Sequence, residues 1–220
     1  MRCERIFGVL YRLGVTGEKL VKPITKEQNR IMCDNVYGQF LAREDCLLLL
    51  VDIQESMLDL CVQKDRVVKN CAALIDIVSI FEIPVFFSQH NAVKLGGFLR
   101  ELVAKVQHPV IRDKLEFSCL ENEGIAQALG NFGRRTILLA GLETHVCIFH
   151  TGAHAARLGY RVHVAGDAVT SRSPFNWETG LRRLERAGVV ISSTEMIIFE
   201  LLNRAGTPEF RRALPVLKAL

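Results

Sequence analysis

Three residues whose side chains could carry out covalent chemistry lie at or just past short apolar runs of the sequence: Asp52, Lys114 and Cys147. A thiol attacks a carbonyl carbon when a carboxylate takes its proton, a cation stabilises the charges and backbone N–H groups hold the oxyanion. Cys147 also lies where an expected strand becomes a helix, and a helix N-terminus lowers the pKa of a thiol. These residues therefore predict nucleophilic acyl chemistry.

The elements that position these residues follow from the hydrophobic pattern. Six short apolar runs predict buried strands: Leu47–Val51, Pro84–Phe87, Pro109–Ile111, Thr136–Ala140, Arg161–Ala165 and Val189–Ile191. Helical spacing of apolar residues predicts a helix over 66–81, and we expect a second one over 146–158. Strands that alternate with amphipathic helices are typical of a parallel sheet that is covered on both faces.

The sequence therefore predicts an α/β fold, a three-layer α/β/α sandwich with a six-stranded parallel sheet. Reactive groups collect at the carboxyl ends of the strands in such a sheet, where Asp52 and Cys147 are expected. The α/β domain is assigned to 46–220, and its last segment, from Thr207 to Leu220, is expected to form a peripheral helix that begins at Pro208. Residues 1–45 carry mixed charge and no motif, and we interpret them as an N-terminal extension of uncertain order.

Composition excludes several classes of protein. The 220 residues are 49% hydrophobic, which is enough for one sizeable core, and the net charge of +4 comes from basic and acidic residues mixed along the chain. No charge block predicts a nucleic-acid partner, and no segment predicts a membrane span. Seven cysteines without a CxxC pair favour a reducing, cytoplasmic compartment over a disulfide framework.

Four segments in the same order give the chain a resemblance to the isochorismatase-like cysteine hydrolases, which include nicotinamidases and N-carbamoyl amidases. The resemblance covers roughly Asp45 to Leu220. The matching segments are Asp52-Ile53-Gln54, Lys114 followed by Phe117-Ser118, Gly141-Leu142-Glu143-Thr144-His145-Val146-Cys147, and Gly159-Tyr160 leading to Asp167-Ala168-Val169-Thr170-Ser171-Arg172. The C-terminal segment from Ser193 to Leu202 is most similar to the branch of isochorismatase domain-containing hydrolases.

The resemblance implies a Rossmann-like fold and a role for each residue: Cys147 as nucleophile, Asp52 as general base and Lys114 as the electrostatic partner. It also implies a cis peptide bond between Leu142 and Glu143, and an oxyanion hole built from the backbone N–H groups of Glu143 and Cys147. The implied reaction is hydrolysis of a small amide-, carbamoyl- or ureide-type substrate through a thioester, without a cofactor. A homo-oligomer is expected, since the family commonly assembles through C-terminal helices.

Departures from the family pattern bear on metal binding and on the type of reaction. Nicotinamidases bind a metal through an Asp-x-His motif, whereas this chain has Gln89-His90-Asn91 at that place. The resemblance therefore implies no metal and leaves His90, with Phe117, as a possible part of the substrate pocket. Isochorismatases proper, which cleave a vinyl ether, lack the nucleophilic cysteine, so Cys147 favours acyl chemistry.

Each of the three candidate catalytic residues also has a structural alternative. Cys147 could be a buried small hydrophobic residue, Asp52 the N-cap of a helix, and Lys114 an ordinary surface lysine. The corresponding second function is a weakly catalytic or non-catalytic oligomeric scaffold or ligand-binding protein of the same fold.

Other polar and aromatic residues are open to more than one interpretation. His150 and His154 have a spacing that can bind zinc, but no acidic third ligand is near in sequence, so a solvated or interface face is preferred. Asp167 and Arg172 are interpreted as structural. Cys119, five residues beyond Lys114, could lie near the pocket, although core packing is the default, and Trp177 could line a pocket or fill the core.

Overall fold

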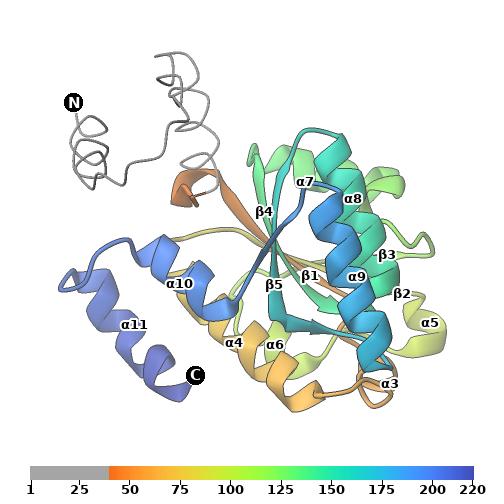
Figure 1. Ribbon diagram of the computed structural model, residues 1–220, viewed down its shortest axis with the longest axis horizontal. Coiled ribbons are helices and arrows are strands. Elements are labelled where there is room, and N and C mark those ends of the chain that lie inside the picture. The colour runs from red at the N-terminus through yellow and green to blue at the C-terminus, as the bar shows by residue number, and fades with distance from the viewer. Residues whose placement is uncertain (1–39) are drawn as a thin grey trace, which may run out of the picture. The chain divides into compact units, whose positions relative to one another are not determined.

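A six-stranded parallel sheet forms the centre of the computed structural model, which describes residues 40–220 (Figure 1). Its spatial order is β3-β2-β1-β4-β5-β6, and every paired neighbour is parallel. The strands are β1 (Cys46–Val51), β2 (Val85–His90), β3 (Val110–Lys114), β4 (Thr136–Leu142), β5 (Arg161–Thr170) and β6 (Val190–Ser192). The predicted α/β fold and its six strands are confirmed.

Helices connect the strands and cover both faces of the sheet. They are α3 (Glu55–Leu58), α4 (Lys64–Ile80), α5 (Ala92–Leu95), α6 (Arg100–Val103), α7 (Glu123–Asn131), α8 (Phe149–Arg157), α9 (Pro174–Arg186), α10 (Thr194–Leu202) and α11 (Pro208–Ala219). Shorter turns are the 3₁₀ turns η2 (Arg43–Asp45) and η3 (Cys119–Glu121), and the π-helical turn η4 (Thr144–Ile148). The helix expected over 66–81 is α4, and the one expected over 146–158 is divided between η4 and α8.

Strand β1 lies in the middle of the molecule and separates two hydrophobic cores. All six of its residues are buried, and alternate side chains point to opposite faces of the sheet. Leu48 and Leu50 pack in the core formed with α4, α10 and α11, whereas Leu47 and Leu49 pack in the core formed with α7, α8 and α9. Figure 1 shows these two groups of helices on opposite sides of the sheet. A strand buried on both faces explains why the run from Leu47 to Val51 has no polar residue.

The order of the strands reverses at β1. The chain moves from β1 outward to β2 and β3, then returns to pair β4 with the other side of β1. Loops that leave β1 and β4 therefore diverge at their carboxyl ends, and parallel α/β sheets bind ligands at such a point. Asp52 follows β1 and Glu143 follows β4, so this reversal places the candidate catalytic segments next to each other.

The residues just before β1 pack against the domain. The Leu41 N–H donates to Glu200 Oε2 at 3.2 Å, and Arg43 donates through its guanidinium to the carbonyls of Leu201 and Leu202 near the end of α10. The expectations for 1–39 lie outside the described residues. Within 40–220, no helix is both long and apolar enough to cross a bilayer.

Candidate active site

A buried ion pair joins the ends of β1 and β3. The Lys114 Nζ donates to Asp52 Oδ2 at 2.7 Å, and neither side chain has exposed area. Asp52 adopts a left-handed conformation, with φ of 58°, directly after β1, while Lys114 is the last residue of β3. Charges removed from water need a close partner, because desolvation of an unpaired ion costs several kcal/mol. Lys114 is therefore not a surface lysine, and Asp52 does not cap α3, whose N-cap residue is Gln54.

Two further side chains lie on the same side of Asp52: Ser88, which the sequence did not single out, and Cys119, for which the sequence allows a place near the pocket. Ser88, on β2 between β1 and β3, donates through its hydroxyl to Asp52 Oδ1 at 3.3 Å. The Cys119 thiol donates in turn to Ser88 Oγ at 3.3 Å. Both oxygens of the Asp52 carboxylate thus have a partner, which fixes its orientation. The sequence signal for Ser88 is its position near the end of β2, the strand next to β1, and the signal for Cys119 is its position five residues beyond Lys114.

Cys147 reaches the same place from the other side of β1. It lies within the π-helical turn η4 and is 3% exposed, and its sulfur is within 4.8 Å of an Asp52 carboxylate oxygen. Turns of this kind are frequent at functional sites. The structure therefore brings Asp52, Lys114 and Cys147 together as the sequence predicted.

The expected lowering of the Cys147 pKa is wrong. Burial raises the pKa of the thiol above its ordinary value, and the negative charge of Asp52 raises it further, whereas the Lys114 ammonium acts in the opposite direction. The argument from the helix N-terminus failed because the thiol faces a carboxylate inside the protein. Cys147 is a neutral thiol at rest.

Lys114 keeps its charge despite its burial. Removal from water alone would lower its pKa, but the Asp52 carboxylate and the two nearby thiols, Cys147 and Cys119, outweigh that effect and raise the pKa above its usual value. The site at rest therefore holds an ammonium, a carboxylate paired with it, and a neutral thiol.

The turn between β4 and η4 depends on Gly141. A Cβ at this residue would lie 2.1 Å from the Val51 carbonyl oxygen, and φ of 138° is a conformation that other residues rarely adopt. The predicted cis bond between Leu142 and Glu143 is wrong, because every peptide bond within 40–220 is trans. The chain turns instead through a left-handed Glu143, with φ of 58° and ψ of 63°.

The Glu143 side chain holds this turn to the loop after β5. Its carboxylate accepts from Arg172 Nε at 3.3 Å and from the Arg172 terminal nitrogen at 3.2 Å. His145, whose Nε2 lies 3.8 Å from the Glu143 carboxylate, also contacts Ser171 Oγ through Nδ1 at 3.1 Å. The assignment of Arg172 as structural agrees with this contact, and it connects the residue to the segment that carries Cys147.

His90 and Phe117 lie side by side next to the buried pair. Their rings stack with centroids 5.8 Å apart and an interplanar angle of 15°. The His150 ring lies against the Phe117 ring, with centroids 6.1 Å apart. Phe117 is half-exposed, whereas a His90 nitrogen lies within 4.8 Å of both the Asp52 oxygen and the Cys147 sulfur. This aromatic group is therefore in a position to contact a substrate.

Three donor atoms are close enough to hold a metal ion together. One ligand atom each from Asp52, His90 and Cys147 lie within 4.8 Å of one another. The pair weighed from the sequence makes other contacts: His150 contacts Phe117 and Phe149, and the Nδ1 of His154 lies 3.0 Å from Ser118 Oγ.

Two other residues have structural positions. Asp167 accepts hydrogen bonds from the N–H and hydroxyl of Thr194, at 2.7 and 2.9 Å, and so fixes the start of α10. Trp177 donates to the Gly166 carbonyl and packs under the Arg66 guanidinium. Both contacts hold helices to the sheet.

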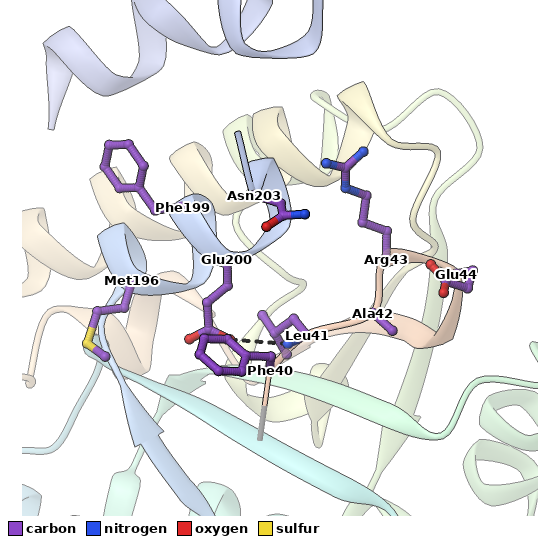
Figure 2. Close-up of a pocket in the computed structure, with 9 residues that line it drawn as sticks. All are labelled: Phe40, Leu41, Ala42, Arg43, Glu44, Met196, Phe199, Glu200 and Asn203. Atoms are coloured by element: carbon purple, nitrogen blue, oxygen red, sulfur yellow. Dashed lines mark hydrogen bonds between the residues drawn. The ribbon is translucent and has the colours of Figure 1, made fainter. Parts of the chain in front are cut away.

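A wide groove lies at the opposite end of β1 (Figure 2). It has a volume of about 860 Å³ and is lined by the segment before β1, by α10 and by the C-cap residue of α10: Phe40, Leu41, Ala42, Arg43, Glu44, Met196, Phe199, Glu200 and Asn203. Its wall includes the exposed apolar side chains of Phe40, Met196 and Phe199. It contains neither the thiol nor the buried ion pair, so its size does not make it the candidate centre for chemistry.

Comparison with known proteins agrees with this geometry. The family model described as the isochorismatase domain matches residues 46–196. The chain belongs to the isochorismatase family. Two curated relatives are each 32% identical over 176 residues: the secreted isochorismatase effector Isc1 of Phytophthora sojae, with 78% of this chain and 84% of that protein covered, and isochorismatase domain-containing protein 2B of Mus musculus, with 80% and 82% covered.

Solved structures confirm the isochorismatase fold. The MAR1 ribonuclease of Caenorhabditis elegans has a TM-score of 0.77 at 24% identity, with 81% of this chain and 92% of that chain covered. The YcaC gene product of Escherichia coli, described as an octameric hydrolase of unknown specificity, has a TM-score of 0.73 at 23% identity, with 81% and 87% covered. At these identities the likeness shows the fold, so the reaction has to be argued from the site.

Proposed function

We propose that this isochorismatase-family chain is a cysteine hydrolase that cleaves a C–N bond of a small amide, carbamoyl or ureide substrate through a thioester. The observation that supports it most is a buried carboxylate, Asp52, that is paired with Lys114 and lies beside the thiol of Cys147. A base, a cation and a nucleophile held together in a dry site are what acyl transfer to sulfur requires.

The first step forms the S–C bond. Asp52 takes the proton of the Cys147 thiol while the sulfur attacks the carbonyl carbon, and the carbonyl oxygen becomes an oxyanion. In this mechanism the backbone N–H groups of Glu143 and Cys147 stabilise that oxyanion, and Lys114 stabilises the negative charge near Asp52.

The second step breaks the C–N bond. Asp52 returns its proton to the departing nitrogen, and the acyl group stays on Cys147 as a thioester. Water then attacks the thioester carbonyl and gives its proton to Asp52, the acid leaves, and the proton returns to the sulfur. Each proton that Asp52 accepts is passed on, so the free enzyme is restored.

The raised pKa of Cys147 fits a step in which proton transfer accompanies attack. A thiol that stays neutral at rest needs its base close by, and both oxygens of Asp52 are held by hydrogen bonds to Lys114 and Ser88. The site therefore favours a concerted transfer over a pre-formed thiolate.

The surroundings support a small substrate. His90 and Phe117 stand next to the reacting groups and provide a flat, partly apolar wall that an acyl portion could contact. Assembly into a homo-oligomer is part of the proposal, and exposed Met196 and Phe199 on α10 supply apolar surface for it. A cytoplasmic location is proposed from the free, buried cysteines of the described residues.

The test is a screen of small amides, carbamoyl compounds and ureides against the full-length protein, with the Cys147→Ala variant beside it. We expect turnover by the native protein, a thioester mass adduct on Cys147 after rapid quenching, and loss of turnover in the variant. Cys71→Ala, which removes a thiol of α4 in the other core, is the matched control and should keep the activity. Equal hydrolysis by Cys147→Ala would refute the mechanism.

A scaffold or ligand-binding protein of the same fold is the second candidate. The wide groove beside α10 favours it, because that hollow is open while the ion pair is closed to solvent. The same screen separates the two candidates. A protein that binds compounds in the groove, hydrolyses none of them and forms no adduct on Cys147 belongs to the second class.

A further inference from the structure

His90 gives the site a nitrogen donor that the hydrolytic mechanism does not use. One of its ring nitrogens lies within 4.8 Å of both an Asp52 carboxylate oxygen and the Cys147 sulfur. These three side chains come from the ends of β1 and β2 and from the turn η4, on both sides of the point where the strand order reverses. Nitrogen, oxygen and sulfur donors are the ligand types that Zn²⁺ takes in proteins.

The backbone of His90 is fixed by a buried glutamine. The Gln54 side chain accepts from the His90 N–H at 2.7 Å and donates to the His90 carbonyl at 3.0 Å. Gln54 has no exposed area, and it also donates to the carbonyl of Gly96. These bonds tie the last residue of β2 to the segment that follows β1. A ligand attached to a rigid strand end loses little freedom when it binds an ion.

The His90 ring packs against a neighbouring ring, but one of its nitrogens has no hydrogen-bond partner among the described residues. It stacks on Phe117, with ring planes 15° apart. Its Nδ1 is buried and has no hydrogen-bond partner among the described residues. A buried polar atom without a partner costs free energy that a bound ligand can recover, whether the ligand meets this nitrogen or orders the ring.

We propose that Asp52, His90 and Cys147 bind a thiophilic divalent cation of the Zn²⁺ type. The bound ion blocks the Cys147 sulfur and so inhibits the reaction. On binding, the S–H bond of Cys147 breaks and its proton goes to solvent, while the sulfur forms a bond to the metal. Asp52 and His90 each give one lone pair, and water takes the fourth position. No electron is transferred, so chelation of the metal restores the thiol.

The geometry requires only a small contraction. Donors around a tetrahedral Zn²⁺ stand roughly 3.5 Å apart, given bonds of about 2.0 to 2.3 Å, and the three atoms are already within 4.8 Å. Lys114 opposes the ion, because its ammonium holds Asp52 Oδ2 at 2.7 Å and carries the same sign of charge. Binding is therefore weaker than in a structural zinc site, as a reversible inhibitor requires.

The loss of activity on metal binding rests on the proposed function, whereas the metal site itself does not. Titration of the metal alone into the full-length protein needs no substrate. A failed search for hydrolysis would leave the binding measurement intact, and absent binding would leave the hydrolysis screen intact.

The experiment uses Co²⁺ as a spectroscopic probe and Zn²⁺ in calorimetry. We expect one Co²⁺ per chain with a thiolate-to-cobalt charge-transfer band, and Zn²⁺ should protect Cys147 from alkylation, as mapped by mass spectrometry. Cys147→Ser should remove the band, and His90→Gln should weaken binding of Zn²⁺ by ~10-fold or more, as loss of a metal-site group typically does. Lys114→Met should strengthen binding, since the competing ammonium is gone.

Matched controls test other thiols and imidazoles of the chain. Cys71→Ala removes a buried thiol of the other core, His108→Gln removes an exposed imidazole, and the double variant Cys3→Ser/Cys33→Ser removes the thiols before residue 40. All three should bind Zn²⁺ as the native protein does. An unchanged charge-transfer band in Cys147→Ser, or unchanged affinity in His90→Gln, would overturn the proposed site.

Discussion

The two ends of β1 carry very different surroundings. At the carboxyl end, Asp52 and Lys114 form an ion pair that is closed to water, next to the nearly buried thiol of Cys147. At the amino end, Asp45 pairs with Arg161 at 2.6 Å in an exposed setting, close to the start of a wide groove lined by the segment before β1 and by α10. One strand thus separates a small, charged and dry site from a large, open groove with both apolar and polar walls.

The difference shows that size alone does not identify a reactive site. A charge in water interacts weakly with its neighbours, whereas the same charge in a protein interior shifts the pKa of each group around it. Asp52 and Lys114 act in that way on Cys147, while the groove offers area for contact but no nucleophile. The dry end is therefore suited to chemistry and the open end to association.

The largest expected effect comes from breaking the buried pair. Lys114→Met leaves the Asp52 carboxylate buried without its cation, and we expect the free energy of unfolding to fall by ~3 to 5 kcal/mol. Urea unfolding followed by circular dichroism measures this loss. Asp52→Asn combined with Lys114→Met should recover part of it, because no charge then remains unpaired.

The exposed pair at the other end of β1 is the control for that measurement. Arg161→Met removes the guanidinium from Asp45, and a partly exposed ion pair contributes about 1 kcal/mol or less. Equal losses in Lys114→Met and Arg161→Met would mean that burial does not distinguish the two ends.

A methyl group at Gly141 should also disturb the dry end. Gly141→Ala places a Cβ against the Val51 carbonyl and forces a strained φ, so we expect a loss of roughly 2 to 4 kcal/mol. Thermal and urea unfolding measure it. Gly130→Ala in α7, where nothing lies within 4 Å of the added Cβ, should instead be neutral or stabilising by up to ~1 kcal/mol. Two equal destabilisations would contradict the close approach of β1 and β4.

At the open end, Arg43 has a moderate role. Its guanidinium donates to the carbonyls of Leu201 and Leu202 and lies over the Phe81 ring at 4.2 Å. Arg43→Met should lower the free energy of unfolding by ~1 to 2 kcal/mol, mainly through the lost charged hydrogen bonds. Arg186→Met, which changes an exposed arginine near the end of α9, is the comparison, and a loss of the same size there would show that Arg43 has no special contact.

The smallest expected effect is the pH dependence of stability that comes from Glu200, in the wall of the groove. Burial raises the pKa of Glu200, although the Leu41 N–H partly opposes it. A carboxyl group whose folded pKa is raised stabilises the fold below its ordinary pKa of 4.5, and this stability is lost as the pH rises through the folded value. Glu200→Gln should therefore become more stable relative to the native chain as pH rises above 4.5. Unfolding curves at several pH values test the sign, and a constant difference would contradict it.

The strands could be predicted from local pattern, whereas the three central residues were singled out by their places at strand ends together with the family resemblance. A run such as Leu47 to Val51 can be buried on both faces only as an inner strand, and residues that follow parallel strands must meet at one edge. Ser88 was missed, and the contacts of Cys119 and Gln54 were not predicted, because they depend on which side chains approach them across the fold.

Two errors at Cys147 and Glu143 have physical causes. The helix N-terminus was expected to lower the thiol pKa, but burial and the Asp52 carboxylate have the larger effect. The cis bond was taken from the resemblance, whereas a left-handed Glu143 turns the chain with a trans bond and its side chain is tied to Arg172. The groove could not be foreseen, since it is formed by segments that are distant in sequence.

The π-helical turn that carries Cys147 limits which deletions the chain can accept in this segment. A π turn holds one residue more than an α turn, and each residue in a helix advances the side chains by about 100°. Deleting one residue between Thr144 and Ile148 could therefore preserve a continuous helix into α8 while rotating the thiol away from Asp52. The length of this segment is therefore constrained by the direction in which the Cys147 sulfur must point to lie beside Asp52.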